Sequence, residues 1–222
     1  MIPTTKFKAA LCGLALITAA VLPANAASAV PQTLSSEAAA ASKPVPKLGY
    51  STQTLKTLNI DFQYQQTSYW CGPAATRIAL SARISPPSQQ QLANELPTTT
   101  NGTDWIGQVT RVLNNHLGTG WYETKEMPND PPTQAQRDLL WRDVVLDIDN
   151  NYPIVANIVA PASNHPPGYP NYTIYHYFTV IGYDSSDMTV KIADPANFGG
   201  NQIYWLTFNQ LATLIPPKGY SA

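Results

Sequence analysis

The sequence predicts an α+β fold, because helical patterns fill the first half of its folded domain and strand-like runs fill the second half. In the first half, apolar residues recur at spacings of three and four, which is typical of helices with one buried face. In the second half, runs rich in β-branched and aromatic residues are separated by turn-forming clusters, which favours an antiparallel sheet. The helical patterns lie within residues 73–150, and the strand-like runs are 154–160, 172–183, 188–194 and 201–208.

The first residues of the chain are typical of an export signal. Two lysines precede an apolar run from 9 to 22, and residues 24–26, Ala-Asn-Ala, are the small residues that a signal peptidase requires. We therefore expect residues 1–26 to be a signal peptide that is cleaved near Ala26, and the protein to be secreted. The apolar run is shorter than the roughly 20 residues that cross a bilayer, so no membrane insertion is expected.

The region after the signal, residues 27–50, is biased towards Ala, Ser and Pro and has no sustained apolar period. This composition predicts a flexible leader, although a pro-segment that caps the active site stays open as an alternative. Residues 51–222 are long enough for one domain with a sizeable core. Cys12 lies in the signal and is removed with it, so Cys71 is the one cysteine of the mature chain.

The composition argues against several classes of partner. Charged residues make up 12% of the chain, against about 25% in typical globular proteins, and the net charge is -1. No basic cluster points to nucleic acid or to an anionic membrane surface, and no acidic block points to a charged tail. We therefore expect no nucleic-acid partner.

The helical segments begin and end at recognisable residues. The first runs from Pro73 to Ile84, and Pro73 suits a first turn because the N–H that it lacks has no helical partner there. Cys71 therefore lies at or just before a helix N-terminus. The other three helices are expected from the N-cap Ser88 to Leu96, from about Asp104 to Gly118, and from about Thr133 to Asn150.

Turn-forming clusters at 184–187 and 195–200 separate the last three strand-like runs and predict hairpins. If the first turn is centred on Ser185, residues whose numbers sum to 370 lie opposite each other, which pairs His176 with Asp194. An imidazole that donates to a carboxylate is held in one tautomer and is stabilised when it becomes charged. The pairing is therefore suited to a general base.

Cys71, His176 and Asp194 are a candidate nucleophile, base and orienting group. A helix N-terminus favours the thiolate, which is the nucleophilic form of cysteine, and Gly72 leaves room for a substrate to approach. Taken singly, the three have structural interpretations: a small buried hydrophobe, a half-buried strand histidine and a turn-starting aspartate. Taken together, in this order along the chain, they favour a hydrolase that forms an acyl-thioester on Cys71.

Three segments resemble the motif blocks of cysteine peptidase family 39, whose best-known members cut bacteriocin leaders after a double glycine. The segments are YQQTSYWCGPAA, YHYFTVIGYD and KIADPAN, and the resemblance covers about residues 58–215. It implies a papain-like fold, with the nucleophile at a helix N-terminus packed on an antiparallel sheet. It also implies that Cys71 is the nucleophile, that His176 is the general base and acid, and that Asp194 orients the histidine.

The family also has a glutamine six residues before the cysteine, whose side-chain amide helps to form the oxyanion hole. That position is Gln65 here, and its neighbour is Gln66, so the choice between the two stays open. Acyl transfer requires preorganised donors to a tetrahedral oxyanion, and a glutamine amide with the backbone N–H of Cys71 would supply two. A pair of solvated loop glutamines is the alternative interpretation.

Two departures limit what the resemblance implies. The best-known members belong to membrane-bound export transporters and commonly carry an acidic residue before the cysteine, whereas this chain has Trp70 and its own export signal. It is similar to the stand-alone, exported bacterial branch, and the double-glycine specificity is not carried over. We expect a secreted, monomeric cysteine peptidase-like hydrolase that acts on a peptide or protein substrate. A cell-wall amidase or transpeptidase, and a non-catalytic binding module on the same scaffold, stay open.

The other histidines have different expected roles. His116 falls in the last turn of the third helix, where a cation is favourable, so a structural role is expected. His165 lies in the Pro-rich segment 160–172, just before the strand that carries His176, and this segment is expected to form a rim of the cleft. One cysteine and dispersed histidines give no metal-ligand spacing, so neither a metal nor another cofactor is expected.

Overall fold

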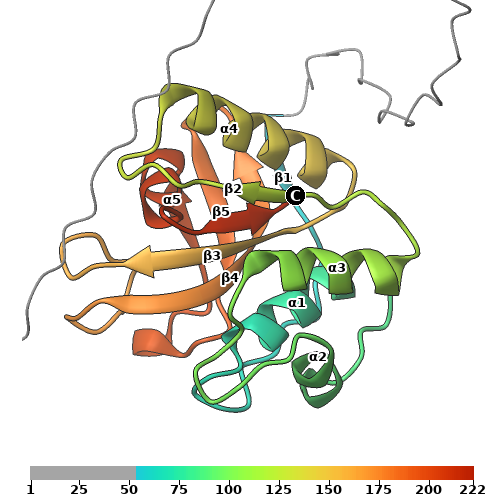
Figure 1. The fold of residues 1–222 in the computed structure, drawn as a ribbon. Helices are drawn as coiled ribbons and strands as arrows, with labels where there is room; N and C mark the ends of the chain where they lie inside the picture. The colour runs from blue at the N-terminus through green and yellow to red at the C-terminus, as the bar shows by residue number, and fades with distance from the viewer. Residues whose placement is uncertain (1–53) are drawn as a thin grey trace, which may run out of the picture. The chain divides into compact units, whose positions relative to one another are not determined.

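The computed structural model describes residues 54–222, so the predicted signal peptide and leader lie outside the described residues. Figure 1 shows strands between two groups of helices, which confirms the α+β fold. The first group comprises α1 (Cys71–Ser81), α2 (Gln89–Glu95) and α3 (Ile106–Leu117), and the second comprises α4 (Gln134–Asp149) and α5 (Phe208–Leu214). No helix within residues 54–222 is both long and apolar enough to cross a membrane.

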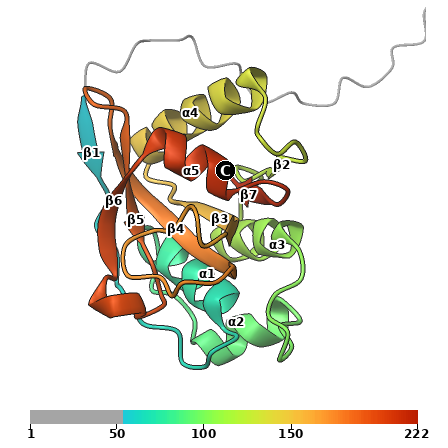
Figure 2. The same cartoon turned by 90° about the vertical axis from the view of Figure 1, so that its left-hand side faces the viewer.

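The strands form one antiparallel sheet with the order β2-β7-β3-β4-β5-β6, and β1 pairs with β4 outside this order. In Figure 2 this order can be followed from β6 on one side through β4 and β3 to β7 on the other. The strands are β1 (Leu55–Thr57), β2 (Thr124–Glu126), β3 (Ile154–Ala160), β4 (Ile174–Asp184), β5 (Thr189–Ala193), β6 (Ile203–Thr207) and β7 (Gly219–Ser221), and Phe198–Gly200 forms a short 3-10 helix.

The ends of the helices follow from capping residues that the sequence predicts. The Ser88 side chain accepts a hydrogen bond from the backbone N–H of Gln91 at the start of α2. Thr133 and Gln136 form a reciprocal capping box at the start of α4. Gly118 ends α3 in the left-handed conformation, with φ of 58°. In contrast, α1 begins after Trp70 with no side-chain cap, so its first N–H groups remain available for other acceptors.

The sequence did not predict several short elements, namely β2, α5 and β7. The expected strand 201–208 ends at Thr207, whose hydroxyl accepts from the backbone N–H of Gln210 and starts α5. The strands β2 and β7 have three residues each, too few to show an apolar period. The α5 helix had a sequence signal that was missed, since a threonine three residues before a glutamine is a common N-terminal cap.

The predicted register of the hairpin that carries the candidate histidine is wrong. The ladder between β4 and β5 pairs Thr179 with Ala193 and Asp184 with Thr189, with a register shift between Val180 and Gly182. The turn therefore has four residues, 185–188, and the strands are offset from the predicted pairing by two positions before the register shift and three after it. Asp194 lies one residue beyond the last pair of the ladder, so backbone pairing does not place it opposite His176.

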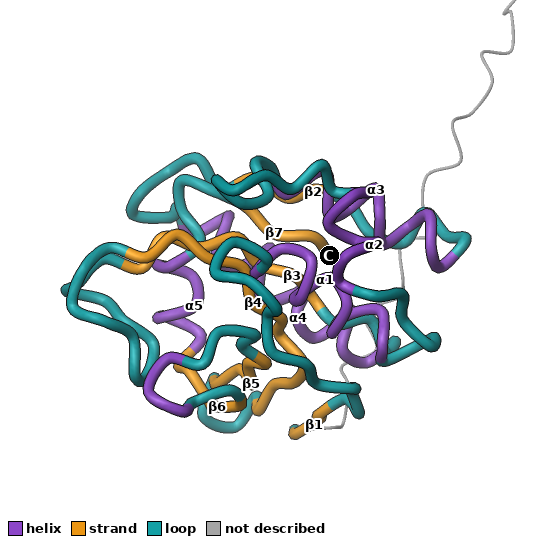
Figure 3. Tube along the Cα trace, turned by 90° about the horizontal axis from the view of Figure 1, so that it is seen from below, coloured by secondary structure: helices purple, strands orange, loops and turns teal. Residues whose placement is uncertain are grey.

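The two larger hydrophobic cores lie on the two faces of the sheet, and neighbouring residues of β4 belong to different cores. Tyr177 packs in the core formed with α1, α2 and α3, which also contains Cys71 and Leu113. Phe178 packs in the larger core with α4 and α5, together with Ile148. Figure 3 shows this separation, with α1, α2 and α3 grouped together and α5 on the other side of β4.

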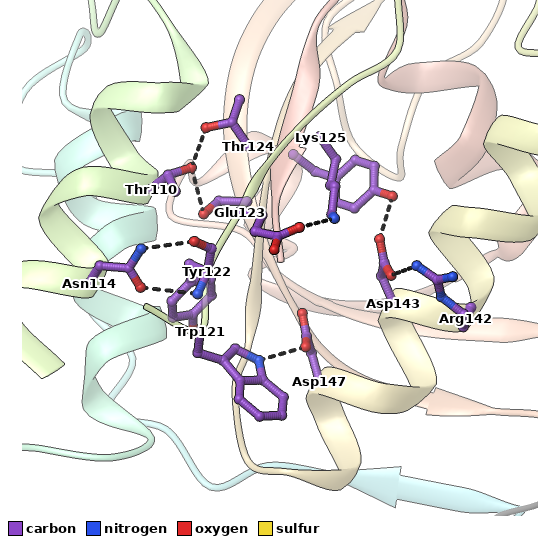
Figure 4. A network of polar contacts seen from close by, with 12 residues as sticks. Thr110, Asn114, Trp121, Tyr122, Glu123, Thr124, Lys125, Arg142, Asp143 and Asp147 are labelled. Carbon is purple, nitrogen blue, oxygen red and sulfur yellow. Dashed lines mark hydrogen bonds and ion pairs between the residues drawn. The ribbon is translucent and has the colours of Figure 1, made fainter. Parts of the chain in front are cut away.

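A network of polar contacts joins α3 and α4 to the segments between them (Figure 4). The Asn114 side chain of α3 donates to the Tyr122 carbonyl at 2.8 Å and accepts from the Tyr122 N–H at 3.0 Å. From α4, Asp147 accepts from the indole N–H of Trp121 at 2.7 Å, and Asp143 accepts from the Tyr220 hydroxyl at 2.9 Å. These contacts fix the two helix groups to the edge of the sheet formed by β2 and β7.

Candidate active site

Cys71 is the first residue of α1, as the position of Pro73 predicts, and the residue is 9% exposed. The start of α1 has no side-chain cap, and the backbone N–H of Gly72 helps to lower the pKa of the Cys71 thiol. The backbone N–H of Tyr177 on β4 lowers the pKa of the same thiol. The thiol therefore meets two backbone donors and the positive end of a helix, which all favour a thiolate.

His176 and Asp194 are in direct contact although backbone pairing does not place them opposite each other. The His176 Nε2 and Asp194 Oδ1 atoms are 2.7 Å apart, and the two residues are 4% and 0% exposed. Because Nε2 faces Asp194, the other ring nitrogen, Nδ1, remains for Cys71, to which the His176 side chain is hydrogen-bonded. The structure thus brings together the three predicted residues from α1, β4 and the end of β5.

The electrostatics of these residues favour a thiolate–imidazolium pair. Burial acts to raise the pKa of the Cys71 thiol, but the hydrogen bond and charge of His176 and the backbone donors together lower it. Burial acts to lower the pKa of His176, but the Asp194 carboxylate and the Cys71 thiolate raise it well above its ordinary value. Burial likewise opposes the ionisation of Asp194, whose pKa is nevertheless lowered by His176 and by two tyrosines.

Those tyrosines, Tyr169 and Tyr204, were missed by sequence reasoning. Their hydroxyls donate to Asp194 Oδ2 at 2.6 Å and 2.7 Å. The backbone N–H of Ala196 donates to Oδ1 at 2.9 Å, so His176 shares that oxygen. Tyr204 lies on the predicted final strand and Tyr169 in the Pro-rich segment 160–172, and no local pattern in the sequence relates either of them to Asp194.

Gln65 and Gln66 have different environments. The Gln65 backbone N–H donates to the Pro195 carbonyl at 2.9 Å, so this residue lies beside the loop that follows Asp194. Its side-chain Nε2 donates to the Thr67 carbonyl at 2.9 Å, and its Oε1 is buried without a hydrogen-bond partner among the described residues. Gln66 is exposed, and its backbone N–H donates to the Gln89 side chain. Only Gln65 therefore has a side chain directed into the protein near the site.

A cavity of about 200 Å³ lies near Tyr177, the residue after His176, because Asn157, which lines the cavity, donates to the Tyr177 hydroxyl at 2.9 Å. Thr103 packs on Gly72, since a Cβ atom added there would lie 2.2 Å from the Thr103 Oγ1 atom. Tyr177 accepts a hydrogen bond from Asn157, and its pKa is raised by burial and by the charges of Cys71 and Asp104. Neither Cys71 nor His176 is among the residues that line the cavity. Its lining residues are Asp104, Trp105, Ile106, Glu126, Asn157, Pro217, Lys218 and Gly219.

Exposed aromatic side chains lie around this part of the surface. Trp105 is 51% exposed and donates from its indole N–H to Glu126 at 2.9 Å. Tyr175, the residue before His176, is 69% exposed, and the Lys218 Nζ atom lies 5.8 Å from the centre of its ring. Exposed aromatic rings beside a cavity are suited to contacts with a bound chain.

The remaining histidines lie outside the group formed by Cys71, His176 and Asp194. His116 at the end of α3 contacts Glu95, with Nε2 and Oε2 2.6 Å apart, which fits the structural role expected of it. His165 packs its ring 6.3 Å from that of Tyr169, so the Pro-rich segment reaches the site through Tyr169. Residues 54–222 contain no group of three or more His, Cys, Asp or Glu side chains that could hold a metal ion.

Residues 57–214 match the model of the Peptidase_C39 like family. The chain belongs to this family. The match confirms the resemblance drawn from the sequence, and the fold is the papain-like α+β fold that the resemblance implied. Membership of this family supports a cysteine peptidase-like fold. A comparison with the sequences of curated proteins gave no match.

Among solved structures, a protein from Bacillus anthracis named as a C39-like peptidase has a TM-score of 0.50 at 14% identity, covering 76% of this chain and 97% of that one. The peptidase domain of Streptococcus ComA, a bi-functional ABC transporter, has a TM-score of 0.48 at 18% identity, covering 74% and 98%. Xylellain, a cysteine protease from Xylella fastidiosa, has a TM-score of 0.43 at 14% identity, covering 76% and 85%. At these identities the similarity concerns the fold alone.

Proposed function

We propose that this C39-like protein is an exported hydrolase that cleaves a peptide or amide bond through an acyl-thioester on Cys71. The observation that supports it best is the buried contact between His176 and Asp194 beside a thiol whose pKa is lowered. Export is proposed from the pattern of residues 1–26. The proposed substrate is a peptide or protein chain.

In the proposed reaction, the Cys71 thiolate attacks the carbonyl carbon of the scissile bond, and the carbonyl oxygen becomes an oxyanion. The Cys71 backbone N–H and the Gln65 amide are the proposed donors to that oxyanion. The imidazolium of His176 then gives a proton to the leaving amine as the C–N bond breaks. Asp194 holds the imidazole in the tautomer that this transfer requires.

The acyl-thioester is then hydrolysed. Neutral His176 takes a proton from a water molecule, and the resulting hydroxide attacks the thioester carbonyl. The C–S bond breaks, the acid product leaves, and the thiolate–imidazolium pair is restored. Two of the roles in this cycle, base and acid, fall to the same ring nitrogen, Nδ1, because Nε2 remains bound to Asp194.

Alkylation of Cys71 with iodoacetamide as a function of pH tests this proposal without knowledge of the substrate. In a chain that begins at residue 27, Cys71 is the one cysteine. A lowered thiol pKa keeps the thiolate present as the pH falls, and a raised His176 pKa keeps the imidazolium present as the pH rises. We therefore expect fast alkylation to persist below pH 7, where an ordinary thiol with a pKa of about 8.5 is mostly protonated.

The matched variants are His176→Ala and Cys71→Ala. At about pH 6 we expect His176→Ala to react at least tenfold more slowly than the wild type, because a tenfold change in thiolate accompanies each unit of pKa. Cys71→Ala should take up no label. Equal rates in wild type and His176→Ala, both with the profile of an ordinary thiol, would contradict the proposal and favour a non-catalytic binding module.

A further inference from the structure

Asp194 is held by two phenols in addition to its contact with His176. Its Oδ2 accepts from the hydroxyls of Tyr169 and Tyr204, and its Oδ1 accepts from His176 and from the Ala196 N–H. Asp194 itself is 0% exposed, so no solvent is available to replace a missing donor. A buried carboxylate that loses a hydrogen-bond donor bears the cost of its desolvation.

The two phenols come from separate parts of the fold. Tyr204 lies on β6, directly opposite Ile192 of β5, and is therefore fixed by the sheet. Tyr169 lies in a loop whose backbone packs closely against that of Phe198 at the preceding residue, Gly168. A Cβ atom added to Gly168 would lie 2.3 Å from the Phe198 carbonyl oxygen. Gly168 also has a φ of +81°, so both its conformation and its contact require glycine.

Tyr169 also packs around the histidine. Its ring centre lies 4.5 Å from that of Phe198 and 6.0 Å from that of His176, and Phe198 lies 5.9 Å from His176. The pKa of each phenol, Tyr169 and Tyr204, is raised by burial and by the Asp194 charge. Both hydroxyls therefore keep their protons and remain donors near neutral pH.

We propose that Tyr169 and Tyr204 are positioning residues, which keep Asp194 ionised and turned towards His176, so that formation of the thiolate–imidazolium pair depends on both phenols. The inference rests on the proposed function of Cys71 and His176. With both donors removed, Oδ2 would lie uncompensated in a dry environment, and the neutral acid would be favoured. A neutral Asp194 stabilises the imidazolium less, so the Cys71 thiol holds its proton to higher pH.

The test uses Tyr169→Phe, Tyr204→Phe and the double variant in the iodoacetamide assay across pH. A hydrogen bond to a charged group is commonly worth enough to move an ionisation by about one pH unit. We therefore expect the midpoint of thiolate formation to rise by about one unit in the double variant and by less in each single variant. Each single variant retains one donor to Oδ2, so the single variants test the inference even if the double variant does not fold.

Tyr220→Phe is the matched control. Tyr220 is also a buried tyrosine, and it donates to a different buried carboxylate, Asp143, at 2.9 Å. The Tyr220→Phe substitution should lower the melting temperature and leave the pH midpoint of thiolate formation at Cys71 unchanged. If the Tyr169 and Tyr204 variants lose stability as Tyr220→Phe does but keep the wild-type midpoint, the phenols serve stability alone and the inference is overturned. The pH profile of alkylation in the wild-type protein tests the proposed function separately, because no tyrosine is altered in that protein.

Discussion

Asp194 follows the last residue of β5 and precedes Pro195, a position in which an aspartate commonly starts an exposed turn. In the structure it is fully buried and accepts hydrogen bonds from two tyrosines, an imidazole and a backbone N–H. The backbone N–H of Asp194 donates to the Gln202 carbonyl at 2.8 Å, which extends the pairing between β5 and β6 by one residue. The chemistry proposed for His176 therefore depends on a carboxylate whose neighbours come from three segments of the chain.

The proposed role of the Gln65 amide as a donor to the oxyanion can be tested by substitution of this single residue. If its amide donates to the oxyanion, Gln65→Ala should lower kcat/KM for peptide hydrolysis by about 10² to 10³ and leave the alkylation of Cys71 unchanged. The reason is that the oxyanion forms only in the transition state, whereas the thiolate is present before the substrate binds. Kinetics on a peptide that the wild type cleaves would measure the change.

Gln66→Ala is the control for that experiment, because Gln66 is the exposed neighbour. Its kcat/KM should remain close to that of the wild type. A large loss in Gln66→Ala together with a small one in Gln65→Ala would reverse the assignment of the donor.

At the scale of elements, the start of α1 determines how the thiol is presented. Pro73 fits the first turn, and the absence of a side-chain cap at Trp70 leaves backbone N–H groups to the sulfur. The α1 helix also contacts β4, because the Thr179 hydroxyl of β4 donates to the Ala75 carbonyl of α1 at 2.9 Å. This buried contact fixes α1 to the strand that carries His176, so the distance between thiol and imidazole is set by packing between the two elements.

Gly72→Ala tests the role of the α1 N-terminus. The added Cβ would lie 2.2 Å from Thr103 Oγ1 and 2.7 Å from Thr103 Cβ, so either Thr103 or the start of α1 must move. Overpacking of this kind typically costs about 1–3 kcal/mol in the free energy of unfolding. We expect that loss in urea unfolding and, because Cys71 is the adjacent residue, slower alkylation at about pH 6.

Gly120→Ala is the matched control, since a Cβ atom there would meet nothing within 4 Å. It should leave both stability and alkylation close to wild type. Unchanged alkylation in Gly72→Ala would mean that Thr103 moves aside and that the presentation of the thiol does not depend on this contact.

At the scale of the whole molecule, the two larger hydrophobic cores share one sheet, and the candidate site lies where residues from both meet. Cys71 belongs to the core with α1, α2 and α3, whereas Tyr169 and Tyr204 belong to the core with α4 and α5. The polar network of Figure 4 links these helix groups at the β2 and β7 edge of the sheet. Contacts distant from the site thus also join the two helix groups.

Asn114→Ala tests how much this network contributes to stability. The substitution leaves both the N–H and the carbonyl of Tyr122 without the partners that they have in the network, and Tyr122 is 2% exposed. Buried polar groups that lose a partner cost about 1–3 kcal/mol, so we expect a decrease of that size in the free energy of unfolding. Urea unfolding measures it.

Asn115→Ala, on the exposed side of the same helix, should change the free energy of unfolding by less than about 0.5 kcal/mol. Equal stability of the two variants would mean that solvent satisfies Tyr122 and that the network does not join the two helix groups.

The sequence by itself determined the order and type of the main elements, since apolar periodicity and capping residues act over a few neighbouring residues. It also determined that Cys71 starts a helix and that His176 and Asp194 are candidates for its partners. It failed for short elements such as β7 and for the hairpin register, because a four-residue turn and a bulge leave no periodic signal. Only the tertiary structure brought Tyr169 and Tyr204 onto Asp194. Contacts of that kind depend on how sheet, loop and helix pack together, and a buried carboxylate acquires its donors from whichever segments the packing brings near it.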